Sequence, residues 1–182
     1  PSGGTSYVRR MSAKSPWGYP LKEQPQGNWL HSSGTGPGQS SSWYPTAIPS
    51  NESLTQHGYA TYWHHTGTPA GWFTQPTFST NKFFVFETYV TSETTQSIDY
   101  LLGGNEGHSL FVNNQFVKGA GFGNDNVSGT LSFQAGVPVK VTLVGYNSGA
   151  DTHISFRTAD LQNIEDIPGV SVSAKLLRVT SS

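Results

Sequence analysis

Two adjacent asparagines, Asn113 and Asn114, constrain the fold of this chain more than any other feature, because short alternating runs of residues flank them. After glycine, asparagine most readily accepts the positive φ angles that a two-residue hairpin turn requires. We therefore predict a tight β-hairpin within residues 103–118. Its register opposes three pairs of residues, Val112 and Gln115, Phe111 and Phe116, and Leu110 and Val117. One face of this hairpin is then apolar, formed by Leu110, Val112 and Val117.

The rest of the sequence also favours short strands. Its 182 residues include 21 glycines and 11 prolines, which interrupt the chain too often for long helices, and 13% are aromatic. Alternating apolar residues predict further strands at residues 83–90, 96–102, 131–133, 139–143, 154–156 and within 170–179. We expect the first two to be neighbours, and the next two to form a second hairpin around residues 135–138. The predicted fold is all-β, an antiparallel jelly-roll β-sandwich.

The first 50 residues show no period typical of a helix or strand, yet they carry large aromatic residues, namely Trp17, Tyr19, Trp29, Trp43 and Tyr44. Disordered linkers lack such residues. We predict that residues 1–50 form an irregular, aromatic-rich N-terminal arm, packed on the sandwich or on a partner, and that residues 51–182 form the sandwich. Because the chain begins at Pro1, we expect it to be part of a longer protein.

Charge and cysteine content exclude several classes of partner. Charged residues make up 12% of the chain and its net charge is -1, so we predict binding neither to nucleic acid nor to an anionic membrane surface. No apolar run approaches the ~20 residues needed for membrane insertion. The absence of cysteine removes disulfides and thiolate metal sites. We expect an extracellular, cell-surface or virion location.

The hairpin, and the strand-turn-strand rhythm after Thr130, resemble galactose-binding-like jelly-roll domains, including the PA14 type, over about residues 83–157. That resemblance implies carbohydrate binding. In calcium-dependent PA14-like lectins, two consecutive aspartates hold a calcium ion at the positions that match Asn105 and Glu106. This chain departs from that pair, which lowers the charge of the site, although Asp125 would add a carboxylate. The alternative is that residues 105–107 only turn the chain.

A second candidate is a site where sugar rings stack on aromatic side chains. Pyranose rings pack C–H patches against Trp or Tyr, and neighbouring polar groups bind the hydroxyls. The residues of suitable type are Trp63, His64, His65, Trp72, Phe122, Asn124 and Asp125. Trp72, which follows a Pro-Ala-Gly turn, is the preferred stacking residue. The alternative for each aromatic residue is a place in the core.

Other chemistries have little support in the sequence. His64 and His65 are adjacent, so a strand would point them to opposite faces, and no zinc-binding spacing of histidines occurs. The chain carries no nucleophile elbow of the Gly-x-Ser-x-Gly type with its partners in order. Carboxylate pairs for glycoside hydrolysis would arise by chance among eleven acidic residues. We predict that the chain is not an enzyme.

Two functional interpretations remain. The first is a non-catalytic, lectin-like module that binds a glycan or polysaccharide, with calcium as a cofactor, within a larger surface, secreted or phage tail protein. The second is a structural domain of a virion, such as a tail-fibre or capsid decoration domain. In that case the aromatic arm serves self-association or contact with other virion or surface proteins.

Overall fold

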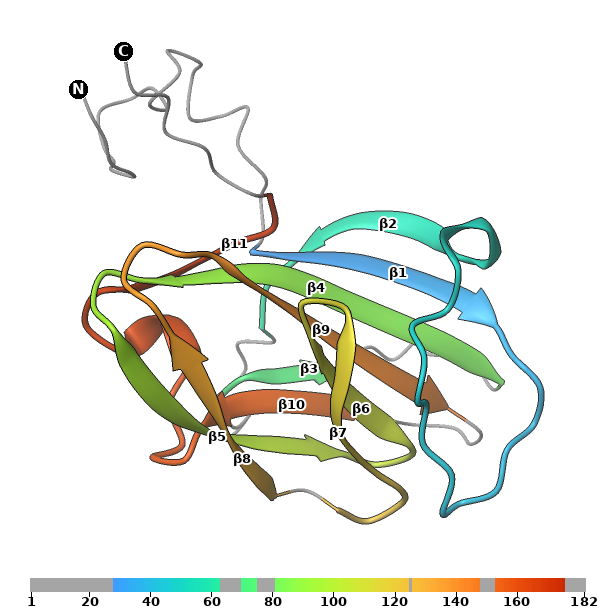
Figure 1. Cartoon of the computed structure of the whole chain (residues 1–182). Coiled ribbons are helices and arrows are strands. Elements are labelled where there is room, and N and C mark those ends of the chain that lie inside the picture. Colours follow the sequence, from blue (N-terminus) through green and yellow to red (C-terminus); the bar gives the residue numbers. More distant parts are fainter. Residues whose placement is uncertain (1–27, 63–69, 75–80, 125, 148–152, 176–182) are drawn as a thin grey trace.

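The fold is an antiparallel sandwich of two β-sheets, which confirms the all-β prediction (Figure 1). The computed structural model describes residues 28–62, 70–74, 81–124, 126–147 and 153–175. Within these residues the only helical segments are two single 3-10 turns, η2 (Asn51–Ser53) and η3 (Ile164–Asp166). None of the described segments is a helix with the length and apolar character needed to cross a membrane.

One sheet has seven strands. Its order is β2 (Thr55–Ala60), β1 (Trp29–Thr35), β4 (Lys82–Ser92), β9 (Val139–Asn147), β6 (His108–Val112) and β7 (Gln115–Ala120). The seventh strand, β11 (Val170–Ser173), pairs with the C-terminal half of β4, beyond the part of β4 that pairs with β1. Strand β4 is therefore the long central member to which both ends of the described chain are joined.

The other sheet has four strands, in the order β3 (Trp72–Thr74), β10 (His153–Thr158), β5 (Gln96–Gly104) and β8 (Val127–Phe133). From β4 onward, most consecutive strands lie in different sheets, as expected for a jelly roll. Two predicted pairings are therefore wrong. The strands at 83–90 and 96–102 are not neighbours, and those at 131–133 and 139–143 do not form a hairpin. Alternation shows which residues face the core, but not which sheet a strand joins.

The main core lies between the two sheets and is rich in aromatic residues. Its largest fully buried side chains are Trp29, Phe84, Phe86, Tyr100, Phe156, Leu102, Leu110, Leu143, Ile154 and Ile164. Around Trp29 the rings of Tyr62, Phe73 and Phe156 pack edge to face, at centroid distances of 6.0, 5.3 and 6.4 Å. Such pairs add to the stabilisation that burial of apolar area provides.

Strand β1 is a correction to the predicted irregular arm. Residues Trp29–Thr35 pair with both β2 and β4, and Trp29 lies fully inside the core. The sequence signal fails here because His31 and Ser32 are also buried, so the strand does not alternate cleanly between apolar and polar residues. Residues 1–27 lie outside the described residues, and the division of the chain at residue 50 stays a prediction.

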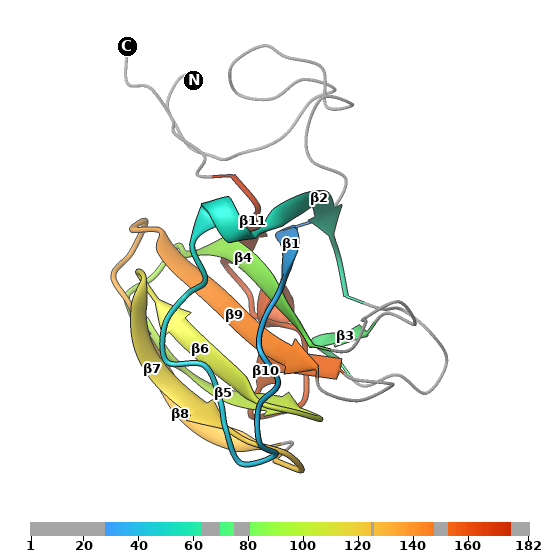
Figure 2. The same ribbon diagram turned by 90° about the vertical axis from the view of Figure 1, so that its right-hand side faces the viewer.

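The segment between β1 and η2 runs across the outer face of the seven-stranded sheet (Figure 2). The Trp43 ring contacts Phe83 and Tyr146 at centroid distances of 6.0 and 5.5 Å. Below it, a second, smaller apolar cluster joins the sheet residues Val85, Phe111 and Val144 to Ile48, Leu54 and Phe83. This part of the N-terminal region is thus ordered by packing on the sandwich.

The predicted hairpin is present as β6 and β7. Both Asn113 (φ 49°) and Asn114 (φ 67°) have positive φ, and Val112 opposes Gln115 and Phe111 opposes Phe116 as predicted. The third pair is wrong: Leu110 opposes Lys118, because the register shifts between Leu110 and Phe111. A β-bulge of this kind inserts one residue into one strand. Val117 consequently points outward and is 42% exposed, so it does not join the apolar face.

Candidate functional site

The predicted ligand residues that the structure describes gather at one end of the sandwich. The backbone of Asn105 links the elements there: its N–H donates to the carbonyl of His153 (3.2 Å), and its carbonyl accepts from the N–H of Gly123 (3.3 Å). These bonds tie the β5–β6 turn both to the start of β10 and to the loop after β7. Predictions made at distant positions of the sequence therefore meet in space.

Trp72 lies on the outer face of the four-stranded sheet. It pairs with Ser155 of β10, while the next residue, Phe73, points into the core. The half-buried Trp72 ring stacks on the ring of His153, with centroids 3.7 Å apart and planes 12° apart. Since β3 is an edge strand among the described residues, this stacked pair lies at the margin of the sheet. The two rings form an aromatic platform there.

Two polar residues of β10 follow His153 on the same face, because alternate residues of a strand share a face. Ser155 is buried, and its hydroxyl has no hydrogen-bond partner among the described residues. Arg157 is 9% exposed and donates from Nη2 to the side-chain oxygen of Asn126 (2.9 Å), while its Nε has no partner within the described part of the chain. Buried donors without partners are unusual and call for an explanation, such as an ordered water or a ligand.

The loop after β7 completes this end of the molecule. Phe122 is 59% exposed, and its N–H donates to the carbonyl of Ser41 (2.7 Å), which holds the loop against the segment before η2. The Asn124 side chain donates to the carbonyls of Gly121 (3.1 Å) and Phe122 (3.3 Å). Asn124 therefore shapes the loop, and Phe122 is its exposed apolar tip.

The predicted calcium site is only partly described. Asn105 and Glu106 form the half-buried turn between β5 and β6, whereas Asp125 lies outside the described residues. Burial raises the pKa of Tyr146; a backbone hydrogen bond with Gln39 lowers it in part, and the nearby charge of Glu106 makes a smaller contribution that raises it. Among the described residues, no group of three or more His, Cys, Asp or Glu side chains is placed to hold a metal ion. Trp63, His64 and His65 also lie outside the described residues.

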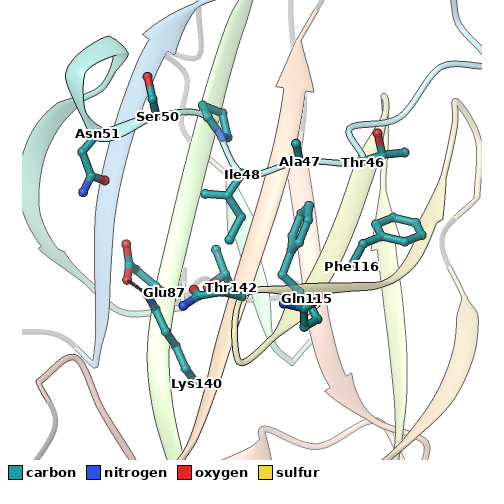
Figure 3. Close-up of a pocket in the computed structure, with 13 residues that line it drawn as sticks. Thr46, Ala47, Ile48, Ser50, Asn51, Glu87, Gln115, Phe116, Lys140 and Thr142 are labelled. Carbon is teal, nitrogen blue, oxygen red and sulfur yellow. Dashed lines mark ion pairs between the residues drawn. The ribbon is translucent and has the colours of Figure 1, made fainter.

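A second feature, which the sequence did not indicate, is a groove of about 640 Å³ on the outer face of the seven-stranded sheet (Figure 3). One side is the segment from Thr46 to Asn51, and the other is formed by residues of β4, β9 and the β6–β7 hairpin. Figure 3 shows Glu87, Lys140, Thr142, Gln115 and Phe116 facing that segment. Its volume is within the range of small-molecule sites, about 300–1,000 Å³.

Sequence patterns carried little information about most of these residues. His153, Ser155 and Arg157 occur at alternate positions, which indicates an exposed strand face, but no local signal shows that the face adjoins Trp72. The groove depends on residues from five segments, and only the tertiary fold brings them together.

The chain matches no known family model and no curated protein. Solved structures that resemble it include the following two. A β-glucosidase from Kluyveromyces marxianus in complex with glucose is 11% identical, with a TM-score of 0.40; the match covers 72% of this chain and 15% of the glucosidase chain. A PA14 sugar-binding domain from an RTX adhesin is 10% identical, with a TM-score of 0.38, and the match covers 74% of this chain and 92% of that domain. Membership of the galactose-binding-like or PA14 family stays a prediction.

Proposed function

We propose that this chain is a non-catalytic carbohydrate-binding module, and that its ligand stacks on Trp72. The observation that carries the proposal is the Trp72–His153 stack beside Ser155 and Arg157. An aromatic platform next to unsatisfied hydrogen-bond donors matches the two faces of a sugar ring, whose C–H groups are apolar and whose hydroxyls are polar. The binding surface extends toward the loop that carries Phe122 and Asn124.

A glycan array tests this proposal with the full chain. We expect Trp72→Ala to abolish the binding of glycans that stack on this ring, without loss of the folded state, because the ring lies at an edge of the described sheet and is only half buried. Trp72→Phe should retain weaker binding, because it keeps an aromatic face. The matched control is Tyr59→Ala, which removes a 40% exposed ring from β2, a strand of the other sheet. Unchanged binding by Trp72→Ala would refute the assignment.

The array also tests the class of sugar. Arg157 is the charged side chain beside the platform, and a guanidinium binds carboxylates in a bidentate manner. We therefore propose that acidic saccharides, such as uronic-acid oligomers, bind more tightly than their neutral counterparts. Arg157→Gln should remove that preference and leave stacking on Trp72 intact. An Arg157→Gln variant that binds acidic sugars as tightly as the unmodified chain would contradict the role of Arg157.

Calcium at Asn105, Glu106 and Asp125 remains a proposal of its own. Calorimetric titration of chelator-stripped protein with calcium should release or absorb heat and raise the melting temperature if the ion binds. No heat and no change in melting temperature would end it. The surface, secreted or phage tail context, the virion assembly alternative and the absence of catalysis stay predictions.

A further inference from the structure

The floor of the groove is a row of side chains that crosses four strands. Backbone pairing places Glu87 of β4 opposite Thr142 of β9, Thr142 opposite Phe111 of β6, and Phe111 opposite Phe116 of β7. Opposed residues share a face, so the row runs in register from a carboxylate through a hydroxyl to two aromatic rings. The sheet thus fixes the order of polar and apolar groups along the groove.

The opposite wall is held in place by its own packing. Ile48, at the middle of the segment from Thr46 to Asn51, joins the apolar cluster of Val85, Phe111 and Val144. Nearby, the Ser109 hydroxyl donates a short hydrogen bond to the carbonyl of Pro45. Because both contacts hold this segment on the sheet, the packing of the fold itself forms the groove.

The charged groups of the groove neutralise each other. Lys140 Nζ lies 3.2 Å from Glu87 Oε1, and the two side chains are 24% and 26% exposed. Among the described residues that line the groove, they are the only acidic and basic side chains. A charged ligand would therefore meet no net opposite charge. A neutral ligand with hydroxyl groups would find a donor and an acceptor side by side, together with the amides of Asn114 and Gln115.

Thr142 gives independent evidence for a ligand. The residue is 1% exposed, and its hydroxyl has no hydrogen-bond partner among the described residues, although it lies on the groove floor. A buried hydroxyl without a partner destabilises the folded state. A ligand hydroxyl seated beside Thr142 would supply that bond after rotation about the Thr142 χ1 angle.

We propose that this groove is a second ligand site, and that it binds a neutral, polyhydroxylated ligand of the size of a short oligosaccharide. The ligand's C–H face packs on Phe116, which is 41% exposed, and its hydroxyls reach Thr142 and the Glu87–Lys140 pair. The ligand is again a carbohydrate, as in the proposed function, but a neutral one; the groove lies on the other sheet and does not depend on Trp72. A polysaccharide that engages both sites would bind with gained avidity.

The test is titration of the isotope-labelled full chain with maltose, cellobiose and lactose, followed by NMR of the backbone amides. We expect at least one sugar to shift the amides of Gln115, Lys140 and Thr142, and to do so equally in Trp72→Ala. Shifts confined to β3, β10 and the loop at residues 121–124 would overturn the groove and leave the first site standing. Shifts confined to the groove would support it, and the acidic saccharides of the glycan array test the Trp72 proposal separately. No shifts at the groove with any sugar would overturn it.

Thr142→Val separates a binding role from a purely structural one. It replaces the hydroxyl by a methyl group of similar shape, so we expect a higher melting temperature without ligand and an affinity at the groove that is lower by roughly fivefold or more. Thr130→Val, on the exposed face of β8, is the matched control and should leave the affinity unchanged. A more stable Thr142→Val protein with undiminished affinity would overturn the proposal.

Discussion

Asn113 and Lys140 are joined by two hydrogen bonds, one between their backbones and one from the Lys140 backbone to the Asn113 side chain. The N–H of Asn113 donates to the carbonyl of Lys140 (2.8 Å), and the N–H of Lys140 donates to the Asn113 side-chain oxygen (2.9 Å). The asparagine thus turns the hairpin and also ties that turn to β9. The same contact fixes the strand from which the Lys140 side chain reaches Glu87 in the groove.

Substitutions in the turn should separate these two roles of Asn113. Asn113→Ala is expected to lower the free energy of unfolding by about 2 kcal/mol, because alanine disfavours positive φ and cannot accept the bond from Lys140. Asn113→Gly should lower the free energy of unfolding by about 1 kcal/mol, because glycine accepts the positive φ but cannot accept the hydrogen bond from Lys140. The control, Asn114→Gly, should change stability by less than ~0.5 kcal/mol, since Asn-Gly suits this turn. Urea denaturation measures all three, and an Asn113→Gly variant as stable as the unmodified chain would contradict the second role.

Gly119 should be essential for docking of the segment before η2. A Cβ atom at this position would lie 2.3 Å from the Tyr44 ring, so Gly119→Ala must displace that segment. We expect faster proteolytic cleavage within residues 36–50 and a lower melting temperature. Gly38→Ala is the control, because its nearest neighbour would be 3.8 Å away. Adding Tyr44→Ala should reduce the effect of Gly119→Ala; purely additive losses would disprove the clash.

Stability should fall in mild acid because of His31. Burial, and secondarily the charge of His57, lowers the pKa of His31 from 6.5 to about 4. The folded state therefore binds fewer protons than the unfolded state between these values, so stability is complete above pH 6.5 and is lost as the pH falls toward 4. The shift corresponds to about 3 kcal/mol. Urea denaturation across this range should give a flatter profile for His31→Gln than for the control His57→Gln; identical profiles would exclude His31 as the cause.

Trp29 should contribute far more to stability than Trp43, although both belong to the region predicted as an arm. Trp29→Ala removes a fully buried ring from the core and should cost about 3–5 kcal/mol. Trp43 is only half buried on the outer face, so Trp43→Ala should cost less, about 1–2 kcal/mol. Calorimetric melting of the two variants measures the difference. A loss for Trp29→Ala of only about 1–2 kcal/mol would contradict its place in the core.

Arg157 should bind ligand at the expense of stability. No carboxylate forms an ion pair with it among the described residues, where the Glu87–Lys140 pair is the one salt bridge found. We therefore expect Arg157→Met to leave the free energy of unfolding unchanged or to raise it by about 1 kcal/mol, while binding of acidic saccharides weakens. A large loss of stability, measured in urea, would show that Arg157 is structural.

Local residue preferences predicted the hairpin turn, whereas the pairing of distant strands could not be predicted from the sequence. Asn113 and Asn114 were sufficient to place the turn, because their backbone preference is a local property. The bulge that moves Val117 outward depends on how β7 meets β6, which the alternating pattern does not encode. The same limit explains why strands were assigned to the wrong neighbours.

The candidate sites show a similar division. Trp72 was chosen from the sequence because a Pro-Ala-Gly turn precedes it; the structure places its ring at an edge of the described sheet, and its role in binding stays a prediction. Arg157 and Thr142 gave no such signal, because each was noticed only as a buried group with an atom that has no hydrogen-bond partner among the described residues. That property depends on neighbours that are remote in sequence, and it can be recognised only in the folded molecule.

The alternation of strands between the two sheets has a kinetic consequence. Among the described strands, only β1 with β2 and β6 with β7 pair with their immediate successors in the chain. Every other pairing must close a longer loop before any contact rewards it, and such topologies fold on timescales of about milliseconds to seconds. The asparagine hairpin is then the natural place for folding to begin, and the ring of Trp29 should report the final closure of the two layers.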